Sequence, residues 1–463
     1  MASFTVDEII KATKAEVLQK GTAGYVTAVS TDTRTIGPGE LFIALTGDNF
    51  NGHDFLEDAV SRGAAAIIIS DKSYVKKIEN PVFVFAVSDT KKALEQLAHF
   101  HRMRFNIPVI GVTGSNGKTT TKDMIYSLLS THFKVCATQK NFNNEIGLSA
   151  TLLSMTEDTE VCVVEMGMRG FGQIAELCSV ASPNIGVVTN VGTSHIGILG
   201  SQDNIGKAKK ELIDALPSDG IAILNGDDSR VSAMGDHFEG KVIKYGINGR
   251  YTVRGNDIQY GPAGTRYVCT CFDEAFKVKL NLLGIHNVYD ALAATATARV
   301  LGISPEKIQK ALNEFHNAEQ RQSVYNVHGI SIVDDSYNAN PLSMEMAFRS
   351  IRQLKGNHYF LVLGDMGELG DFSEELHYKT GQKAAEIGFD AVITVGPLSR
   401  LIARGALAGG IPSALSFNSC EEAAHCLMEM VRPGDVVLVK GSHYMHMETI
   451  PALLRGALDR DGK

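Results

Sequence analysis

Apolar residues occur along the chain in short continuous runs, and helix-length amphipathic segments separate these runs. "ELFIAL" (40–45), "AAAIII" (64–69) and "PVFVFAVSD" (81–89) have the length and composition of strands that are buried on both faces. A helical pattern follows over residues 90–105. The pattern predicts a small α/β unit that ends near residue 86.

From residue 107 the chain alternates strand, loop and helix. The expected strands are "IPVIGV" (107–112), "VCVVEM" (161–166), "IGVVTNV" (185–191) and "IAILNGDD" (221–228), and the expected helices include 118–133 and 202–216. This alternation is typical of βαβ units with a mostly parallel sheet. Hairpin-like strands over 250–284 and helices over 284–302 and 304–315 complete this part, so we place a second boundary near residue 316.

The last part of the chain repeats the same alternation. "ISIVDDSY", "HYFLVLGDM", "AVITVG" and "DVVLVKGS" are expected to be strands, with helical runs between them. A second, smaller parallel α/β domain is therefore predicted. The fold class that the pattern indicates is α/β, with domains over 1–86, 87–315 and 316–463.

Composition and charge narrow the class of protein. The chain has 463 residues, of which 44% are hydrophobic and 21% charged, as in a soluble globular protein. A net charge of −8 argues against extensive nucleic-acid binding. No apolar stretch approaches the roughly 18 residues of a membrane span, and the N-terminus lacks the features of a signal peptide. Seven scattered cysteines without a C-x-x-C pair indicate reduced thiols in a cytoplasmic protein and no zinc site.

The stretch "GVTGSNGKTTTKDM" (111–124) has the parts of a phosphate-binding loop, although Val112 stands where the common pattern has its first glycine. Gly114 and Gly117 would let backbone N–H groups approach phosphate oxygens at the start of a helix. Lys118 could bridge the terminal phosphates of a nucleotide, and the Thr119 hydroxyl could bind Mg²⁺. The alternative is a glycine-rich turn between a strand and a helix, with no ligand.

Two further polar residues follow neighbouring strands of the predicted sheet. Glu165 closes "VCVVE", and His195 lies in the loop "TNVGTSHIGILGS". Because the carboxyl ends of parallel strands meet at one edge of a sheet, these side chains should lie near the phosphate-binding loop. Glu165 would hold the metal, while His195 is either a ligand or a bystander.

In this order, "TGSNGKTT", Glu165, "TNVGTSHIG", "GIHNVYDALAA" and "DDSYNANP" resemble the ATP-dependent Mur ligases of bacterial peptidoglycan synthesis. The resemblance covers nearly the whole chain and implies that the offset glycine spacing is the family's own version of the loop. It implies a UDP-sugar-binding module, a central phosphate-loop ATPase domain and a Rossmann-like third domain that closes on ATP. "DDSYNANPLSM" (334–344), "VLGDMGELG" (362–370) and "KNFNNEIGLS" (140–149) look most like the members that add D-Ala-D-Ala to UDP-N-acetylmuramoyl-tripeptide.

The chemistry that this resemblance implies has two steps. ATP phosphorylates the free carboxylate of the nucleotide-linked peptide, and the amine of D-Ala-D-Ala attacks the acyl phosphate to give the amide, ADP and phosphate. The resemblance implies two Mg²⁺ ions, one held by Thr119 and Glu165 and the other by His195. The ATP site it implies consists of Thr113, Gly114, Ser115, Asn116, Gly117, Lys118, Thr119, Asn287 (adenine), Arg321 and Asp335 (ribose).

The segment "KAKKEL" (207–212) occupies the place where the family usually has a lysine that reacts with CO₂ to form a metal-binding carbamate. Lys209 matches best by its spacing to Glu211 and Leu212, and Lys207 and Lys210 are close competitors. A lysine-rich exposed helix face is the alternative. We expect a carbamylated Lys209.

The resemblance also suggests substrate-binding residues. Those expected at the UDP-sugar are Thr31, Thr33, Asp48, Asn49 and Phe50, joined by Asn143 and Asn144 near the sugar and diphosphate. Asn338 and Asn340 are expected at the carboxylate of the dipeptide. His443 stands where an arginine is expected after "KGS", so a permanent cation at this position is in doubt. Turn chemistry is the alternative for the Asp and Asn positions of the first domain.

The same residues also bear on other possible functions. Another Mur ligase or a folylpolyglutamate synthase would share the overall build, but "DDSYNANP" and "GDMGELG" disfavour both. A regulatory GTP switch needs an Asn-Lys-x-Asp segment, and the sequence contains no Asn-Lys dipeptide. In "GMRGFG" (167–172) the glycines have the wrong order for a dinucleotide fingerprint. We expect a monomer whose third domain closes onto ATP.

Overall fold

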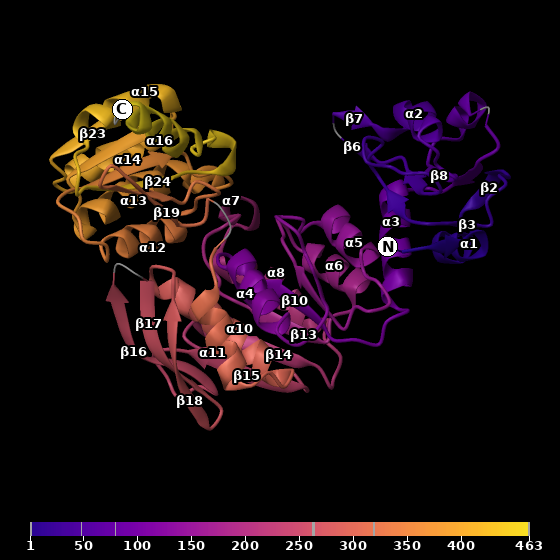
Figure 1. Ribbon diagram of the computed structural model, residues 1–463, viewed down its shortest axis with the longest axis horizontal. Coiled ribbons are helices and arrows are strands. Elements are labelled where there is room, and N and C mark those ends of the chain that lie inside the picture. Colours follow the sequence, from indigo (N-terminus) through magenta and orange to yellow (C-terminus); the bar gives the residue numbers. More distant parts are fainter. Residues whose placement is uncertain (1, 48, 79, 262–263, 318–319, 462–463) are drawn as a thin grey trace.

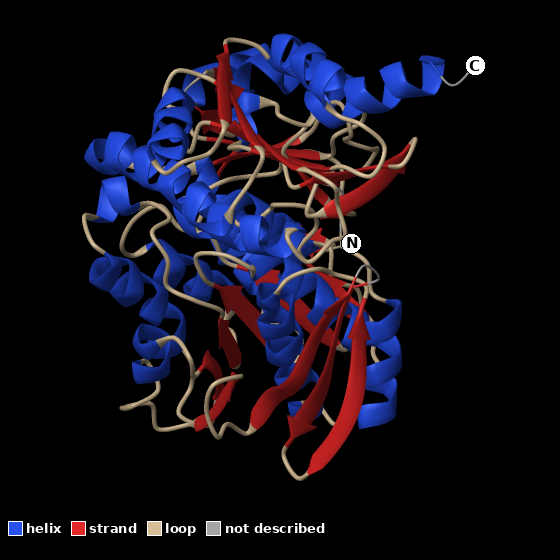
Figure 2. Cartoon of the chain, turned by 90° about the vertical axis from the view of Figure 1, so that its left-hand side faces the viewer, coloured by secondary structure: helices blue, strands red, loops and turns tan. Residues whose placement is uncertain are grey.

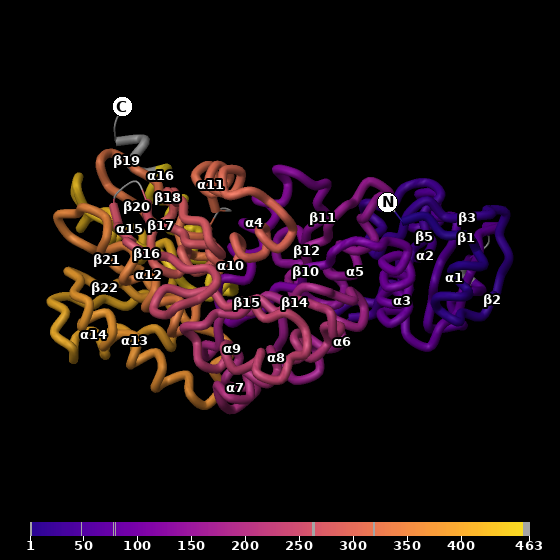
Figure 3. The backbone as a smooth tube through the Cα atoms, turned by 90° about the horizontal axis from the view of Figure 1, so that it is seen from below, coloured from indigo at the N-terminus to yellow at the C-terminus, as the bar shows by residue number. Residues whose placement is uncertain are grey.

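Three α/β units follow one another along the computed structural model, which describes residues 2–47, 49–78, 80–261, 264–317 and 320–461. The N-terminal and C-terminal units lie at opposite ends of the molecule, with the middle unit between them (Figures 1 and 3). Each unit has its own sheet, and helices cover the sheets of the third and middle units (Figure 2). The α/β class predicted from the sequence is confirmed.

The first unit has the sheet order β2-β9-β8-β5-β4, parallel except for β2. The predicted strands are confirmed as β5 (Leu41–Ile43), β8 (Ala66–Ile69) and β9 (Phe83–Ala86). The other elements are β1 (Phe4–Thr5), α1 (Val6–Thr13), β2 (Glu16–Gln19), β3 (Tyr25–Val26), β4 (Val29–Ser30), β6 (Thr46–Gly47), β7 (Phe50–Asn51), η1 (Gly52–Phe55), α2 (Leu56–Ser61) and η2 (Lys72–Lys77).

The middle unit has one long sheet in the order β11-β12-β10-β13-β14-β15-β16-β17-β18. Its strands are parallel up to β16, and the predicted hairpins are confirmed as the antiparallel strands β16–β18. The strands are β10 (Val109–Thr113), β11 (Val135–Ala137), β12 (Val161–Glu165), β13 (Ile185–Val188), β14 (Ile221–Asn225), β15 (Lys241–Gly246), β16 (Val253–Gly261), β17 (Gly264–Cys271) and β18 (Glu274–Leu280). The helices are α3 (Thr90–Arg102), α4 (Lys118–Leu129), α5 (Glu145–Leu153), α6 (Gln173–Ala181), α7 (Ile196–Leu199), α8 (Gln202–Asp214), α9 (Ser229–Ala233), α10 (Ile285–Val300) and α11 (Pro305–Glu314).

Two layers of helices bury the two faces of this sheet. Apolar residues of α3, α5, α6 and α8 cover one face, and those of α4, α10 and α11 cover the other. All five residues of β10 are buried, as expected for a parallel strand between two helix layers. The first core continues into the first unit through Phe4, Leu41 and Phe85. A continuous apolar contact therefore attaches the first unit to the middle one.

The third unit has the order β19-β20-β24-β21-β22-β23, parallel except for the β19–β20 hairpin. Its strands are β19 (Ser323–Val327), β20 (Ile330–Asp334), β21 (Tyr359–Gly364), β22 (Ala391–Val395), β23 (Ser413–Phe417) and β24 (Val436–Lys440). Its helices are α12 (Pro341–Ile351), η3 (Gly370–Phe372), α13 (Ser373–Ile387), α14 (Ser399–Ala408), α15 (Cys420–Met430), η4 (His443–Met445) and α16 (Thr449–Asp461). Helix α12 faces the middle unit (Figure 1). No helix in the described part of the chain is long and apolar enough to cross a membrane.

Candidate active site

The carboxyl ends of β10, β12 and β13 meet at the edge of the middle sheet that faces the third unit. Val112 pairs with Glu165 on one side of β10, and Thr113 pairs with Val188 on the other. A cavity of about 1070 Å³ opens at this edge, lined by residues of the middle and third units. The parallel register thus brings the phosphate-binding loop, Glu165 and the loop after β13 to one place, as predicted.

The loop between β10 and α4 has glycines where no side chain fits. A Cβ at Gly114 would lie 1.8 Å from Oγ1 of Thr189, and one at Gly117 would lie 2.3 Å from Oδ1 of Asp290. Gly117 also has a φ of 79°, which glycine adopts without steric cost. Asn190 supports the loop, because its carbonyl accepts from Ser115 N (2.9 Å) and its side-chain oxygen accepts from Asn116 N (3.0 Å).

Lys118 is the first residue of α4, and its side chain turns back over the loop. The ammonium donates to the carbonyls of Gly114 (2.9 Å) and Ser115 (3.3 Å). Burial in the cavity lowers the pKa of this lysine, while the charge of Glu165 opposes that shift. The cation therefore lies where it can meet the phosphates of a nucleotide held by the loop.

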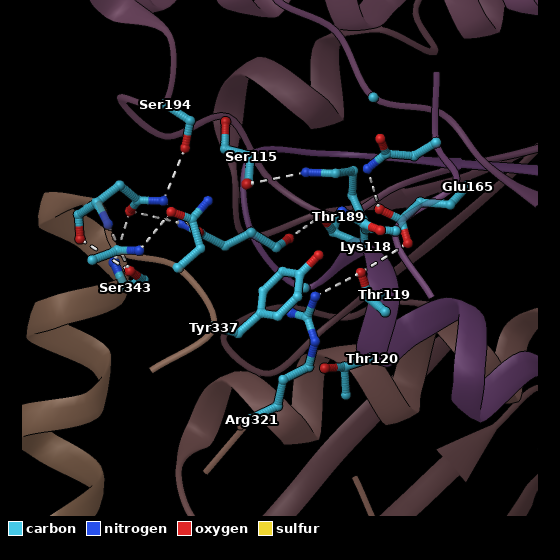
Figure 4. Close-up of a pocket in the computed structure, with 18 of the residues that line it drawn as sticks. Ser115, Lys118, Thr119, Thr120, Glu165, Thr189, Ser194, Arg321, Tyr337 and Ser343 are labelled. Atoms are coloured by element: carbon cyan, nitrogen blue, oxygen red, sulfur yellow. Dashed lines mark hydrogen bonds between the residues drawn. The ribbon is translucent and has the colours of Figure 1, made fainter. Parts of the chain in front are cut away.

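Thr119 and Glu165 lie side by side next to the loop (Figure 4), and Asn143 bonds to the same carboxylate. The Thr119 hydroxyl donates to Oε2 of Glu165 at 2.8 Å, and the Asn143 amide donates to Oε1 at 2.8 Å. Within the described ranges, no group of three or more His, Cys, Asp or Glu side chains lies close enough together to hold a metal ion. One carboxylate and one hydroxyl beside a phosphate site do fit Mg²⁺, which takes few protein ligands and completes its shell with phosphate and water.

The three lysines of α8 lie in different surroundings. Lys209 is 2% exposed and lines the cavity, and its ammonium makes no hydrogen bond or ion pair with any residue that the structure describes. Burial lowers the pKa of Lys209 well below its usual value, with a further contribution from Lys118. Lys207 is exposed, and Lys210 pairs with Asp214. Only Lys209 of this helix therefore offers the cavity a buried amine whose pKa is lowered.

His195 lines the cavity from the loop after β13, and a residue of the third unit meets it. Its Nδ1 lies 2.6 Å from Oε2 of Glu368, whose other oxygen lies 3.2 Å from Nε of Arg169. The close contact with His195 lowers the pKa of Glu368. The carboxylate is therefore the ionised partner of both side chains.

Arg321 reaches the loop from the far side of the cavity. Its Nη2 donates to the Thr119 hydroxyl at 3.2 Å, and its guanidinium carbon lies 4.0 Å from the ring centroid of Tyr337 (Figure 4). Such stacking holds an arginine in one orientation and retains its charge. Arg321 therefore joins the segment before β19 to the start of α4.

Asn287 and Asp335 line the same cavity but have partners within the protein. The buried Asn287 amide donates to the Leu283 carbonyl at 2.7 Å, and it lies beside His286, whose pKa burial lowers to about 4. Asp335 lies 2.6 Å from the ammonium of Lys440, which is 3% exposed. The lysine fixes this carboxylate at the carboxyl end of β20.

Asn338 and Asn340 differ in their availability to a ligand. Asn340 begins α12, and its amide donates to Asn116 Oδ1 (2.7 Å) and to Ser194 Oγ (2.9 Å). Asn338 is exposed at the cavity, and its Oδ1 accepts from Ala339 N at 2.9 Å. Asn340 thus joins the third unit to the phosphate-binding loop, while Asn338 keeps its amide donors toward the cavity.

The residues predicted in the first unit lie apart from this cavity. Thr33 is buried, Thr31 is half-buried, and Asn49 and Phe50 are exposed, in a turn and at the start of β7. Asp48 lies outside the described residues.

Thr113 is fully buried and donates to the Met166 carbonyl at 2.9 Å, so its side chain supports the strand end. Asn144 caps α5 through Gly147 N (2.9 Å) and also lines the cavity.

Several cavity residues were not singled out from the sequence, namely Glu368, Tyr337, Lys440, Asp290 and Ser194. Glu368 and Tyr337 lie within segments whose letters drew attention, "GDMGELG" and "DDSYNANP". Lys440 ends a buried strand, which is the same signal that identified Glu165. Asp290 lies within the segment "GIHNVYDALAA", but it was not chosen because an acid in an alanine-rich helix resembles a surface residue.

Comparison with known proteins gives matches along most of the chain. Residues 112–298 match the Mur ligase middle domain, residues 320–443 match the Mur ligase, glutamate ligase domain, and residues 25–102 match the Mur ligase family, catalytic domain. The UDP-N-acetylmuramoyl-tripeptide–D-alanyl-D-alanine ligase of Bacillus subtilis is 38% identical over 448 residues, which cover 96% of each chain.

Solved structures agree over the same length. MurF from Acinetobacter baumannii superposes with a TM-score of 0.91 at 30% identity, covering 98% of this chain and 99% of that one. MurF ligase from Thermotoga maritima in complex with ADP superposes with a TM-score of 0.86 at 29% identity, covering 94% and 99%. The similarity therefore includes all three units.

Proposed function

The chain belongs to the Mur ligase family, and we propose that it uses ATP to join D-Ala-D-Ala to UDP-N-acetylmuramoyl-tripeptide, forming the pentapeptide precursor of peptidoglycan. Two relatives that each match more than nine tenths of the chain carry that activity in their names. The observation that carries the proposal is the cavity itself. It joins a phosphate-binding loop, a carboxylate and a buried lysine of the middle unit to polar groups of the third unit.

We assign one task to each part of the chain. Residues 1–86 would bind the UDP-sugar, residues 87–315 would bind ATP, and residues 316–463 would bind the dipeptide and close on ATP. The cavity at the junction of the last two parts supports this division. Bringing two anionic reactants together requires positioning and neutralised charge, and the site supplies both.

For ATP, the loop from Thr113 to Thr119 would hold the phosphates. Lys118 would exchange its bonds to the Gly114 and Ser115 carbonyls for bonds to β- and γ-phosphate oxygens. Arg321, which touches the same helix start, would add a second cation. Asn287 would face the adenine, and Asp335, held by Lys440, would accept from the ribose hydroxyls.

For Mg²⁺, the proposed ligands are the Thr119 hydroxyl, the Glu165 carboxylate, His195 and Lys209 as its carbamate. Two bound Mg²⁺ ions would neutralise the phosphate charge during transfer. A neutral amine is the form of lysine that attacks CO₂, and the burial that lowers the pKa of Lys209 favours that form. The carbamate would turn a buried base into an anion that faces the metal site.

The reaction proposed for this geometry transfers the γ-phosphoryl group to the tripeptide carboxylate and releases ADP. The dipeptide amine, once deprotonated, then attacks the acyl carbon and expels phosphate. Asn338 would donate to the dipeptide carboxylate, with Asn340 joining it only by giving up its bonds to Asn116 and Ser194. Thr31, Thr33, Asp48, Asn49 and Phe50 would contact the UDP-sugar, and Asn143 and Asn144 the sugar and diphosphate.

Phosphate release measured with ATP and UDP-tripeptide, with and without D-Ala-D-Ala, tests the proposal. We expect release that depends on the dipeptide and a product heavier by the dipeptide residue mass. Equal turnover with a diamino acid or glutamate as acceptor amine would indicate another ligase of the same build. Nucleotide hydrolysis without ligation would favour a regulatory switch.

Lys118→Ala should abolish phosphate release. Lys207→Ala, which alters an exposed lysine of α8, should retain it. We also propose that the protein acts as a cytoplasmic monomer, which sedimentation and cell fractionation would test.

A further inference from the structure

The loop after β13 and the segment after β21 touch at their backbones across the boundary between the middle and third units. A Cβ on Gly197 would lie 2.4 Å from Gly370 N, and one on Gly370 would lie 2.7 Å from the Gly197 Cα. Ile196 packs against the apolar core of the third unit, and Leu369 is 1% exposed. Two glycines therefore permit a contact that larger residues would prevent.

His195 and Glu368 flank this contact and face each other. Their side chains approach to 2.6 Å, from Nδ1 to Oε2. Both residues have left-handed backbones, with φ of 64° at His195 and 60° at Glu368. Such a conformation is strained for a residue other than glycine and persists where the surroundings enforce it. Two facing residues in this conformation indicate that the geometry of the pair is held in place.

The same carboxylate also reaches a second loop of the middle unit. Its Oε1 lies 3.2 Å from Nε of Arg169, which follows Glu165 by four residues after β12. One side chain of the third unit thus contacts both the loop that follows Glu165 and the loop that carries His195. An ordinary surface ion pair joins only two side chains and does not require the backbones beside it to touch. The contacts of Glu368 differ in both respects.

The chemistry of histidine gives the pair a function. An imidazole that binds a metal through one nitrogen usually donates its other N–H to a carboxylate or carbonyl, and this hydrogen bond fixes the ring and its tautomer. Here Nδ1 faces Glu368, so Nε2 is the nitrogen left for the cavity.

We propose that Glu368 is a positioning residue that orients His195 so that Nε2 serves the metal beside the nucleotide. This inference rests on the proposed function, which places His195 at that metal. It adds that the third unit contributes to the metal site of the middle unit without binding the metal itself. His195 is then oriented for metal binding only when the third unit is docked on the middle unit.

The test is Mn²⁺ binding followed by electron paramagnetic resonance, in the full-length protein with a non-hydrolysable ATP analogue. Of the Mn²⁺ ions that bind, one should depend on His195. We expect Glu368→Ala to lower the affinity for that ion by about 10- to 100-fold. Glu368→Gln, which keeps the size and an acceptor oxygen, should weaken it less. His195→Ala should abolish binding of that ion, and Glu429→Ala, an exposed glutamate of the same unit, should change nothing.

A second readout needs no metal. In protein labelled with ¹⁵N-histidine, wild-type His195 should show one tautomer with the proton on Nδ1, and Glu368→Ala should show a mixture. If Glu368→Ala keeps Mn²⁺ affinity within twofold of wild type while His195→Ala loses it, the inference is overturned and the proposed function stands. If His195→Ala also keeps full affinity, the metal assignment of His195 fails and the inference fails with it.

Discussion

Asp290 lies directly beneath Gly117 of the phosphate-binding loop, so close that a Cβ on residue 117 would come 2.3 Å from its Oδ1. The same oxygen accepts a hydrogen bond from Thr121 at 3.1 Å. Helix α10 therefore supports the loop from below, in addition to the support from Asn190 at its side. The shape of the loop depends on a residue more than 170 positions away in the sequence.

Gly117→Ala should prevent this loop from forming. The left-handed φ of 79° costs an alanine about 1–2 kcal/mol, and the clash with Asp290 adds to it. We expect the affinity for an ATP analogue, measured by titration calorimetry, to fall at least tenfold. Gly24→Ala is the matched control, because residue 24 is exposed and its Cβ would meet nothing within 4 Å. Unchanged affinity in the Gly117 variant would contradict the assignment of the loop.

Asp290→Asn should change how stability depends on pH. Burial raises the pKa of Asp290 to about 8, so the folded protein keeps this carboxyl protonated over a range where the unfolded chain ionises near pH 3.9. Its stabilising contribution is therefore complete below about pH 4 and is lost as the pH rises to 8. At about 1.4 kcal/mol per pKa unit, the wild-type protein should lose on the order of 4 kcal/mol between pH 5 and pH 8. Urea unfolding of Asp290→Asn should lack this loss, and parallel pH profiles for the two proteins would refute the prediction.

Lys209→Met should stabilise the protein and inactivate it. The pKa of Lys209 in the folded protein lies well below that in the unfolded chain, which is about 10.4. The loss of folding stability caused by this buried lysine is therefore complete below the folded-state pKa and disappears as the pH rises to 10.4. In CO₂-free buffer the gain in unfolding midpoint should be larger at pH 7 than at pH 10. Lys207→Met should change neither stability nor activity, since Lys207 is exposed. Bicarbonate should raise the midpoint of the wild-type protein alone, and an equal rise in Lys209→Met would rule out the carbamate.

Arg321→Lys should weaken nucleotide binding although it keeps the charge. The guanidinium stacks 4.0 Å from the Tyr337 ring centroid and bonds to Thr119, and an ammonium cannot reproduce the planar stacking. We expect the Kd of an ATP analogue to rise about tenfold, which is about 1.4 kcal/mol. Arg352→Lys alters a similar stack on Tyr359, at 4.1 Å and outside the cavity, and should leave the Kd unchanged. Equal effects of both variants would show that Arg321 acts only on stability.

The sequence predicted those features of the structure that depend on residues close to one another in the chain. The fully buried central strands such as β10 and β12, the glycine-rich turn into α4 and the acid that closes β12 were found, because a parallel strand between helix layers needs an apolar run and its end needs polar residues. The less buried strands β11, β15 and β23 lack such a run and were not predicted. The edge of the sheet where the site lies followed from the same pattern, since the carboxyl ends of parallel strands meet there.

Contacts between distant segments could not be found in this way. In "KAKKEL" the letters alone do not show which lysine faces inward, and the packing of α8 settled that Lys209 does, which leaves carbamylation as a proposal. The role expected for Asn340 took no account of its bonds to Asn116 and Ser194, which join two units. The pairs Asp335–Lys440 and His195–Glu368 are separated by 105 and 173 positions, so only the folded chain identifies them.

The sequence by itself determined the α/β class, the phosphate-binding loop and the edge of the sheet where chemistry occurs, because periodicity and turn chemistry are properties of short segments. The tertiary structure alone decided which side chains are buried without partners and which cross the boundary between units. Burial and ion pairing depend on how separate segments pack, and that packing sets the charge and orientation on which a ligase site relies.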